Sequence, residues 1–210
     1  MALADLPFGL RPLFGAQARE CALIFPITNN YGTALYINDP VLAVTAGTIE
    51  KAGVSAGCMG SILGLYKQDL PLSLKVERLV PQLYMSATPG TANTWFALVA
   101  INPDLLFIMQ EDGDTSSLIL ADTFALVDMI YTHGGSTVTG ISKAEIDSNT
   151  MDATATRPLQ LLKPYMEYYD LDSGAYGLVN ATNTAGRRAR WVVRIANHQF
   201  NNTSLSVGLA

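Results

Sequence analysis

Few side chains in this 210-residue chain have the types and spacing that hydrolytic chemistry requires. A hydrolase of the serine or cysteine type needs a nucleophile, a base and a group that orients the base. The only histidines are His133, in a Gly-Gly-Ser turn, and His198, after the last predicted strand. Neither a Gly-x-Ser-x-Gly nor a His-Glu-x-x-His pattern occurs. We therefore expect both histidines at the surface and no enzymatic activity.

Metal and phosphate sites have equally weak signatures. The tightest acidic cluster, Glu111 to Asp114, could bind calcium but lacks the alternating ligands and distal Glu of a helix-flanked calcium loop. The pattern favours a solvated hairpin turn. Glycines at positions 53, 57, 60 and 64 lack the strand-to-helix context of a phosphate cradle, so they indicate turns and bulges. We expect no metal and no cofactor.

One basic cluster stands out, with Arg187, Arg188, Arg190 and Arg194 among only 13 basic residues. Strand alternation predicts that Arg188, Arg190 and Arg194 share one face. Three interpretations remain open: pairing with carboxylates at a protein interface, a solvated or intramolecular face, and contact with nucleic acid. The net charge of −5 and the pI of about 4.9 argue against nonspecific nucleic-acid binding, so no nucleic-acid partner is expected.

The composition leaves the nature of the surface open. Hydrophobic residues make up 49% and charged residues 15% of the chain. Either another subunit covers apolar surface, or the surface is neutral and rich in Thr, Ser and Asn. No run approaches the roughly 18 apolar residues of a membrane helix, and residues 1–11 lack a basic leader with an apolar run, so neither membrane insertion nor secretion is indicated. Cys21 and Cys58 are expected to be free, buried thiols.

Short apolar runs separated by turn residues predict an all-β fold, with a sandwich, barrel-like or jelly-roll body over residues 21–200. The run from Thr94 to Ile101 is apolar on both faces and predicts a central strand. In the run from Ala189 to Asn197, Trp191, Val193 and Ile195 share one face while Arg190 and Arg194 share the other, which predicts a strand with one core face. The run from Ser117 to Tyr131 is ambiguous between helix and strand, and we favour strands.

Residues 1–20 lack any regular period, yet they are too apolar for a solvated tail. We expect an extended N-terminal arm that docks on a neighbouring subunit, with an arm folded back on its own domain as the alternative. Its candidate interface residues are Pro7, Phe8, Leu10, Arg11, Leu13 and Phe14. Residues 201–210 form a small-residue C-terminal tail.

A tyrosine-rich stretch over 166–188 suggests an extended, partner-facing loop, with Tyr168 and Tyr169 as candidate contacts. Tyrosines there, together with Trp95 and Trp191, could instead stack on sugar rings, with Glu167 and Asp170 as paired acids. That carbohydrate-binding alternative is less favoured, because the tryptophans lie in predicted core strands.

Several short blocks, in this order along residues 7–198, resemble those of phage head decoration, or capsid cement, proteins. The blocks are Pro7-Phe8-Gly9-Leu10-Arg11-Pro12, Ile37-Asn38-Asp39-Pro40-Val41, Asn102-Pro103-Asp104, Gln110-Glu111-Asp112, Thr139-Gly140, Glu145-Ile146-Asp147-Ser148, Arg157-Pro158-Leu159-Gln160-Leu161-Leu162 and Trp191-Val192-Val193-Arg194-Ile195-Ala196-Asn197-His198.

The resemblance implies a β-structured subunit, usually a homotrimer, that sits where capsomers meet and clamps the major capsid protein. It implies a location in the virion capsid after synthesis in the host cytoplasm, and it carries over no catalytic residue. The longer, tyrosine-rich region from Met166 to Gly186 departs from the family pattern. A tail, baseplate or head-completion component would share the β-rich composition and is the alternative.

Overall fold

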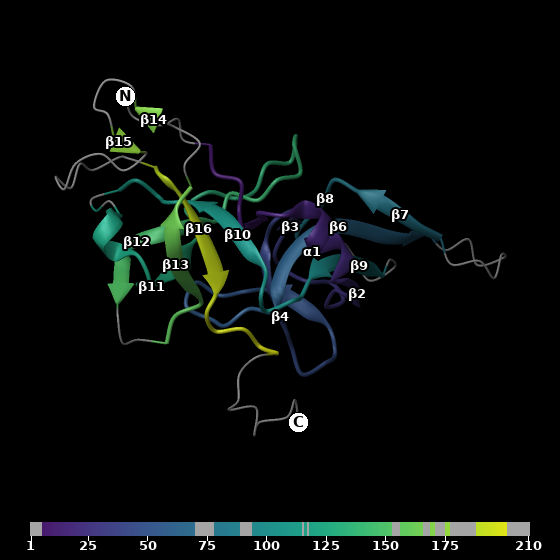
Figure 1. The fold of residues 1–210 in the computed structure, drawn as a ribbon. Helices are drawn as coiled ribbons and strands as arrows, with labels where there is room; N and C mark the ends of the chain where they lie inside the picture. The colour runs from purple at the N-terminus through teal and green to yellow at the C-terminus, as the bar shows by residue number, and fades with distance from the viewer. Residues whose placement is uncertain are drawn as a thin grey trace.

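The fold is described from a computed structural model, which covers residues 6–69, 78–88, 94–114, 116, 118–152, 156–165, 169–170, 175–176 and 188–200. Nearly all of its regular structure is β, as the spacing of apolar runs predicts, and two larger antiparallel sheets pack together as a β sandwich (Figure 1). The helical elements are α1 (Gly15–Glu20) and the 3₁₀ turn η1 (Leu120–Asp122).

Sheet A has six antiparallel strands, in the spatial order β1 (Arg11–Pro12), β10 (Leu106–Gln110), β16 (Arg190–Ile195), β13 (Leu159–Pro164), β11 (Leu126–Ile130) and β12 (Glu145–Asp152). The core face of β16 carries Trp191, Val193 and Ile195, which are almost fully buried. The predicted alternation of this strand is therefore confirmed. The ambiguous run after Ser117 contains a strand, β11, preceded by η1.

Sheet B has the spatial order β2 (Ala22–Pro26), β9 (Trp95–Ala100), β6 (Gly60–Asp69), β4 (Pro40–Ala43) and β5 (Ile49–Lys51), with β7 (Arg78–Gln82) paired to β6. The predicted central strand is β9, between β2 and β6. A parallel bridge joins Ile27, just after β2, to Ile49 in β5, and Thr28 N donates to Ile49 O. Sheet B therefore curls until its first and last strands meet.

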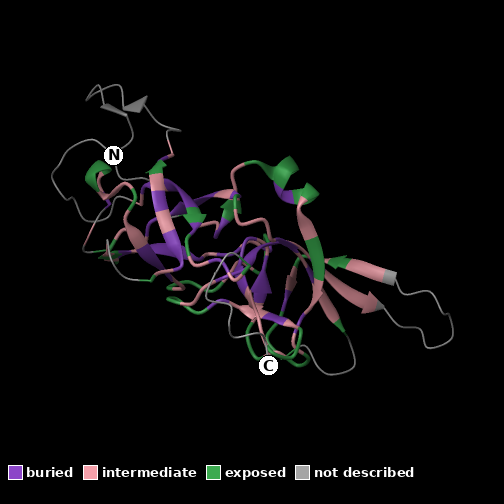
Figure 2. Cartoon of the chain, turned by 60° about the horizontal axis from the view of Figure 1, so that its bottom comes forward, coloured by how far each residue is buried: buried purple, intermediate pink, exposed green. Residues whose placement is uncertain are grey.

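Two short strand pairs complete the fold, β3 (Leu35–Tyr36) with β8 (Tyr84–Met85) and β14 (Tyr169–Asp170) with β15 (Ala175–Tyr176). The outer part of β6 and its partner β7 project from the body in Figure 1. Buried residues concentrate along the strands of the two sheets, and exposed residues along loops and α1 (Figure 2). The two hydrophobic clusters centre on the two sheets, one around Trp191 and Phe107 and the other around Ile62 and Val99.

Gly60 shows why glycines recur near the start of β6. Its φ is 158°, and a Cβ added there would lie 1.9 Å from the carbonyl oxygen of Ala100 on β9. The register of β6 against β9 shifts between Ile62 and Gly64. The expected close backbone approach and bulge are both present.

The expectation of an extended N-terminal arm over residues 1–20 is not confirmed. Residues 1–5 lie outside the described part, but Leu10 and Ala18 are fully buried in the sheet A cluster. β1 pairs with β10, and α1 follows it. The alternative, a segment folded back on its own body, describes residues 8–20, because Leu10 and Ala18 are buried in that body and β1 pairs with its strand β10, although Phe14 remains exposed.

Candidate docking surface

The N-terminal segment is attached to the body through the turn that precedes β4. Asn38 adopts a positive φ of 68°, and its Nδ2 donates to the Phe8 carbonyl at 3.0 Å. Leu10 N donates to Asn38 O at 2.9 Å, while Ser61 Oγ donates to Leu10 O at 2.6 Å. Gly9 also has a positive φ, of 72°, which glycine adopts without strain. Residues 8–10 thus occupy one fixed position over the start of β4 and β6.

This attachment places Phe8 between two arginines that are far apart in sequence. The guanidinium carbon of Arg11 lies 4.6 Å from the Phe8 ring centroid, and that of Arg190 lies 5.3 Å from it. Both distances fall within the range of a cation–π interaction. Arg11 is in register with Ile108, and Arg190 with Gln110, both on β10. The Phe8 ring therefore lies above β10, between the strands on either side of it.

Cations collect on the face of sheet A that points away from its core. Residues paired across an antiparallel sheet share a face, as do alternate residues of one strand. Arg11, Ile108, Val192 and Lys163 form one row, Gln110 and Arg190 a second, and Leu106, Arg194 and Gln160 a third. Strands β1, β10, β16 and β13 contain no Asp or Glu. We call Phe8, Arg11, Arg190, Arg194 and Lys163 the basic face.

The basic face has a covered centre and a charged rim. Ile108 and Val192 lie in the middle and are 2% and 1% exposed, whereas Arg11, Lys163 and Arg194 are exposed and Arg190 is half-buried. Arg194 Nε donates to Gln160 Oε1 at 2.8 Å, which orients its guanidinium along the sheet. This arrangement suits carboxylates of a partner at the rim, because guanidinium groups pair with them bidentately.

The sequence candidates divide into those that join this face and those that do not. Phe8, Arg11, Arg190 and Arg194 join it. Leu10 belongs to the chain's own core, so its proposed role in an interface is wrong. Pro7 and Leu13 are half-buried, and Phe14 is 56% exposed just before α1.

The remaining candidates, Arg188 and the tyrosines Tyr168 and Tyr169, are not part of the basic face as defined. Arg188 was expected beside Arg190, but its φ of 55° breaks the strand alternation, and it packs against Gly113 instead. Tyr168 lies outside the described residues. Tyr169 begins β14, of which the structure describes the backbone pairing with β15.

The acidic loop from Glu111 to Asp114 is not simply a solvated turn, because its first two carboxylates hydrogen-bond to other segments of the chain. Glu111 is fully buried, and its carboxylate accepts hydrogen bonds from Leu118 N at 2.9 Å and Ala189 N at 3.1 Å. Asp112 Oδ1 accepts from Ser148 Oγ at 2.8 Å. Burial raises the pKa of Asp112, although the bonds from Ser148 oppose this. Within the described ranges, no group of three or more His, Cys, Asp or Glu side chains is placed to hold a metal ion.

The sequence gives no local signal for a buried polar network that centres on Asp39. Asp39 is fully buried and accepts from Lys51 Nζ at 3.0 Å, Ser142 Oγ at 2.5 Å and Tyr36 N at 2.9 Å. Lys51 Nζ also lies 4.4 Å from the Tyr131 ring centroid. A serine, a lysine and an aspartate in contact resemble a catalytic set, but Ser142 and Asp39 are both 0% exposed. The network therefore links the two sheets, with its serine and aspartate closed to solvent.

His133 is exposed, as expected, but the expectation for His198 is wrong, because a bridge between His198 and Cys58 draws His198 inside. Its side chain is 2% exposed. Burial lowers the pKa of His198, against the opposing effects of the Met59 and Ile101 carbonyls and of Asp104. The unfolded chain therefore binds the proton more readily than the folded chain does.

Stability should consequently depend on His198 near neutral pH. Its contribution is fully present above the unfolded pKa of about 6.5 and is lost as the pH falls through the lower folded value. We expect the free energy of unfolding to decrease on acidification more steeply in the wild type than in His198→Asn. Guanidinium titrations of both proteins between about pH 7.5 and pH 5 measure this; parallel curves would contradict it.

The two cysteines are free, as expected, but only Cys58 is fully buried. Burial raises the pKa of Cys58 to about 12. The thiolate is the reactive form, so Cys58 should be inert in the folded protein. Cys21 is half-buried beside a groove, and its Sγ accepts from Asn102 Nδ2 at 3.6 Å. We expect a thiol reagent to modify Cys21 in the native protein and both cysteines after unfolding; rapid labelling of Cys58 in native Cys21→Ser would refute this.

No protein-family model, curated protein or solved structure matches this chain. Among the residues that the structure describes, no helix has the length and apolar character needed to cross a membrane.

Proposed function

We propose that this chain is a capsid cement subunit, a phage virion protein that binds between capsomers and stabilises the shell without catalysis. One observation carries the proposal. Phe8 and Arg11, from the first block of the family resemblance, and Arg190 and Arg194, near or within the last block, gather on one part of sheet A, whose strands β1, β10, β16 and β13 contain no Asp or Glu. The chain as a whole has a net charge of −5, so this face is a local exception.

The blocks of the resemblance also contact one another. The first block bonds to Asn38 of the second, Asp112 N donates to Ile146 O between two others, and Ala196 N donates to Pro158 O between the last two. Blocks that are far apart in the sequence therefore lie next to one another in the fold.

The proposed partner is the major capsid protein, contacted through carboxylates that face Arg11, Arg190 and Arg194. Such contacts favour specificity and rapid association at low salt. Nucleic acid would use the same cations, but the acidic remainder of the chain opposes it. Shell binding that survives nuclease treatment distinguishes the two.

Self-association as a homotrimer is the second part of the proposal. Large apolar side chains are prominently exposed at several separate places on the described surface, among them Leu23, Ile24, Leu83, Leu120, Phe124 and Val138. Copies in one trimer would engage neighbouring capsomers together, and avidity of this kind raises affinity by roughly 10²-fold or more. Sedimentation should give about three times the 22.5 kDa chain mass.

The alternatives have less support. A tail, baseplate or head-completion component would occur in a single ring of copies per particle, whereas a cement subunit is repeated over the shell. A carbohydrate-binding role is less favoured because Trp191, one of its candidate stacking residues, is fully buried and cannot contact a sugar ring.

The test uses shells of the virus that carries this chain, stripped of the native subunit. Purified protein should bind them saturably, in a fixed ratio to the capsomers, and should raise the temperature at which they rupture. Bovine serum albumin at the same mass concentration serves as the control. An unchanged rupture temperature together with no saturable binding would refute the proposal.

A further inference from the structure

Phe124 combines two features that are unfavourable in an isolated chain. It has a positive φ of 73°, and it is 68% exposed. Residues with a Cβ rarely adopt this backbone conformation, and glycine, asparagine or aspartate adopt it at lower cost. A large apolar ring that remains in water also contributes little to a hydrophobic core. The stability of the single chain therefore does not account for an aromatic residue at this position.

The loop that carries Phe124 is held in one conformation by hydrogen bonds. Phe124 N donates to Leu161 O at 2.9 Å, and Leu161 N donates to Ala125 O at 3.0 Å, so the loop is joined to β13. Within the loop, Ala125 N donates to Asp122 O at 3.0 Å, and Ile119 N donates to Asp122 Oδ2 at 2.6 Å. Phe124 is therefore presented to a partner without the entropic cost of ordering a flexible loop on binding.

A single side chain connects this loop to the basic face. Gln160 Nε2 donates to Phe124 O at 3.0 Å, while Gln160 Oε1 accepts from Arg194 Nε at 2.8 Å. Gln160 and Arg194 are also register partners on β13 and β16, in the third row of that face. Leu126, the register partner of Gln160 on β11, continues this row toward the loop. Phe124 therefore lies at the β11 end of the basic face.

We propose that Phe124 is the apolar anchor of the docking surface and enters an apolar pocket on the same capsid protein whose carboxylates face the basic face. The inference rests on the proposed function and deepens it. Protein interfaces commonly combine a buried aromatic side chain with a polar rim, and aromatic and arginine residues contribute much of their binding free energy. Phe124 and Arg194 supply both kinds of contact through one shared glutamine. Leu120, which is 66% exposed in η1, extends the apolar part.

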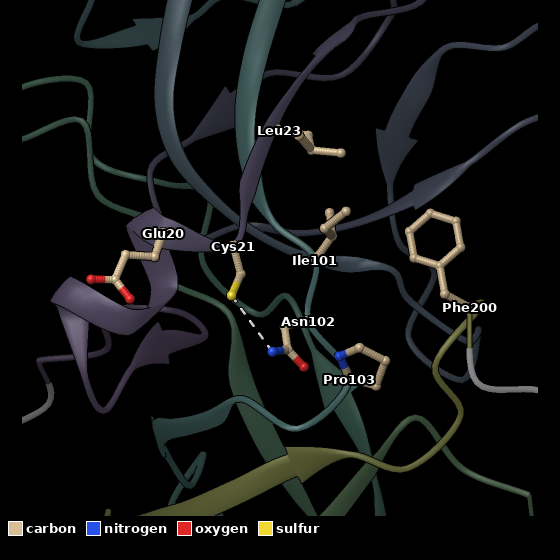
Figure 3. A pocket seen from close by; sticks show the side chains of 7 residues that line it. All are labelled: Glu20, Cys21, Leu23, Ile101, Asn102, Pro103 and Phe200. Atoms are coloured by element: carbon tan, nitrogen blue, oxygen red, sulfur yellow. Dashed lines mark hydrogen bonds between the residues drawn. The ribbon is translucent and has the colours of Figure 1, made fainter.

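Another apolar region borders sheet B and remains available for contacts between copies. Phe200 lies opposite Leu23 and Ile101 across a groove beside β2 (Figure 3). Leu23 is 54% exposed and Phe200 is 51% exposed. Phe124, in contrast, is joined to sheet A. Assigning Phe124 to the capsid protein therefore leaves exposed apolar surface for self-association.

Phe124→Asn tests the inference, because asparagine tolerates a positive φ and lacks the ring. We expect this variant to bind stripped shells at least about tenfold more weakly than the wild type does, with an unchanged or higher guanidinium midpoint. A merely structural role of the ring would instead lower the midpoint.

Phe14→Asn is the matched control. Phe14 is also an exposed aromatic residue, but its φ of −116° is extended and it lies outside the basic face. Phe14 is the N-cap residue of α1, and asparagine is favoured at that position. This variant should therefore fold normally and bind shells within about twofold of the wild type.

The possible failures separate this inference from the proposed function. Wild-type protein that does not bind shells would overturn both. Wild-type binding that Phe124→Asn leaves undiminished, or that Phe14→Asn weakens equally, would overturn the inference alone. A guanidinium midpoint that falls together with binding would assign Phe124 to folding, and loss of the trimer on sedimentation would assign it to contacts between copies; either result would also overturn the inference.

Discussion

Replacing Gly9 by alanine should destabilise the protein by about 3 kcal/mol or more, because two costs add there. The residue has a φ of 72°, and an added Cβ would lie 2.4 Å from the Asn38 carbonyl oxygen and 2.6 Å from Ser142 Cβ. Neither neighbour can move easily, since Asn38 O accepts the bond from Leu10 N and Ser142 is fully buried. Relief requires moving Leu10 out of the core.

Gly15→Ala is the matched control. Gly15 begins α1, has no positive φ, and a Cβ there would have no heavy atom within 4 Å. Alanine is the better helix former by up to about 1 kcal/mol, so stability should be unchanged or slightly higher. Guanidinium midpoints at constant m-value give both numbers. Equal midpoints for Gly9→Ala and the wild type would mean that residues 8–10 are not held on the body.

Reversing charge on the basic face should abolish most shell binding while leaving the fold intact. Arg11→Glu and Arg190→Glu each place a carboxylate where the proposed partner presents one. Loss of a paired interfacial charge costs about 2–5 kcal/mol, so we expect at least about thirtyfold weaker binding for each variant. Arg190 is half-buried and Arg11 is exposed, so Arg190→Glu should have the larger effect.

The control for this pair is Lys67→Glu, which makes the same charge change on β6 of sheet B. It should bind stripped shells within about twofold of the wild type, since it lies outside the basic face. Guanidinium midpoints of all three variants separate binding from folding. Equal losses from all three would indicate a response to net charge alone, against a specific docking surface.

Strands β9 and β16 could be predicted because their signals are local. A run apolar on both faces indicates a central strand, and alternation around Trp191 indicates one core face. The curl of sheet B could not be predicted, since it depends on a bridge between Ile27 and Ile49 with no local signature. The burial of His198 could not be predicted either, because its bridge to Cys58 joins two distant parts of the sequence and has no local pattern.

Only part of the basic face could be predicted from the sequence. Alternation places Arg190 and Arg194 on one face, but the addition of Phe8 and Arg11 depends on where the N-terminal segment folds. That position is fixed by hydrogen bonds with Asn38, whose positive φ is rare for a residue other than glycine. For this reason the apolar residues without a regular period predict an extended arm that docks on a neighbouring subunit. Because Leu10 lies in the core, deletion of residues 1–15 should impair folding as well as shell binding.

Copy number and position in the native particle test the central claim most directly. Electron cryomicroscopy of virions containing this chain, with quantitative mass spectrometry of the same particles, measures both. We expect the chain on the outside of the shell, repeated at the junctions between capsomers, with the basic face against the capsid protein. A single ring of copies at a vertex or in the tail would contradict the assignment.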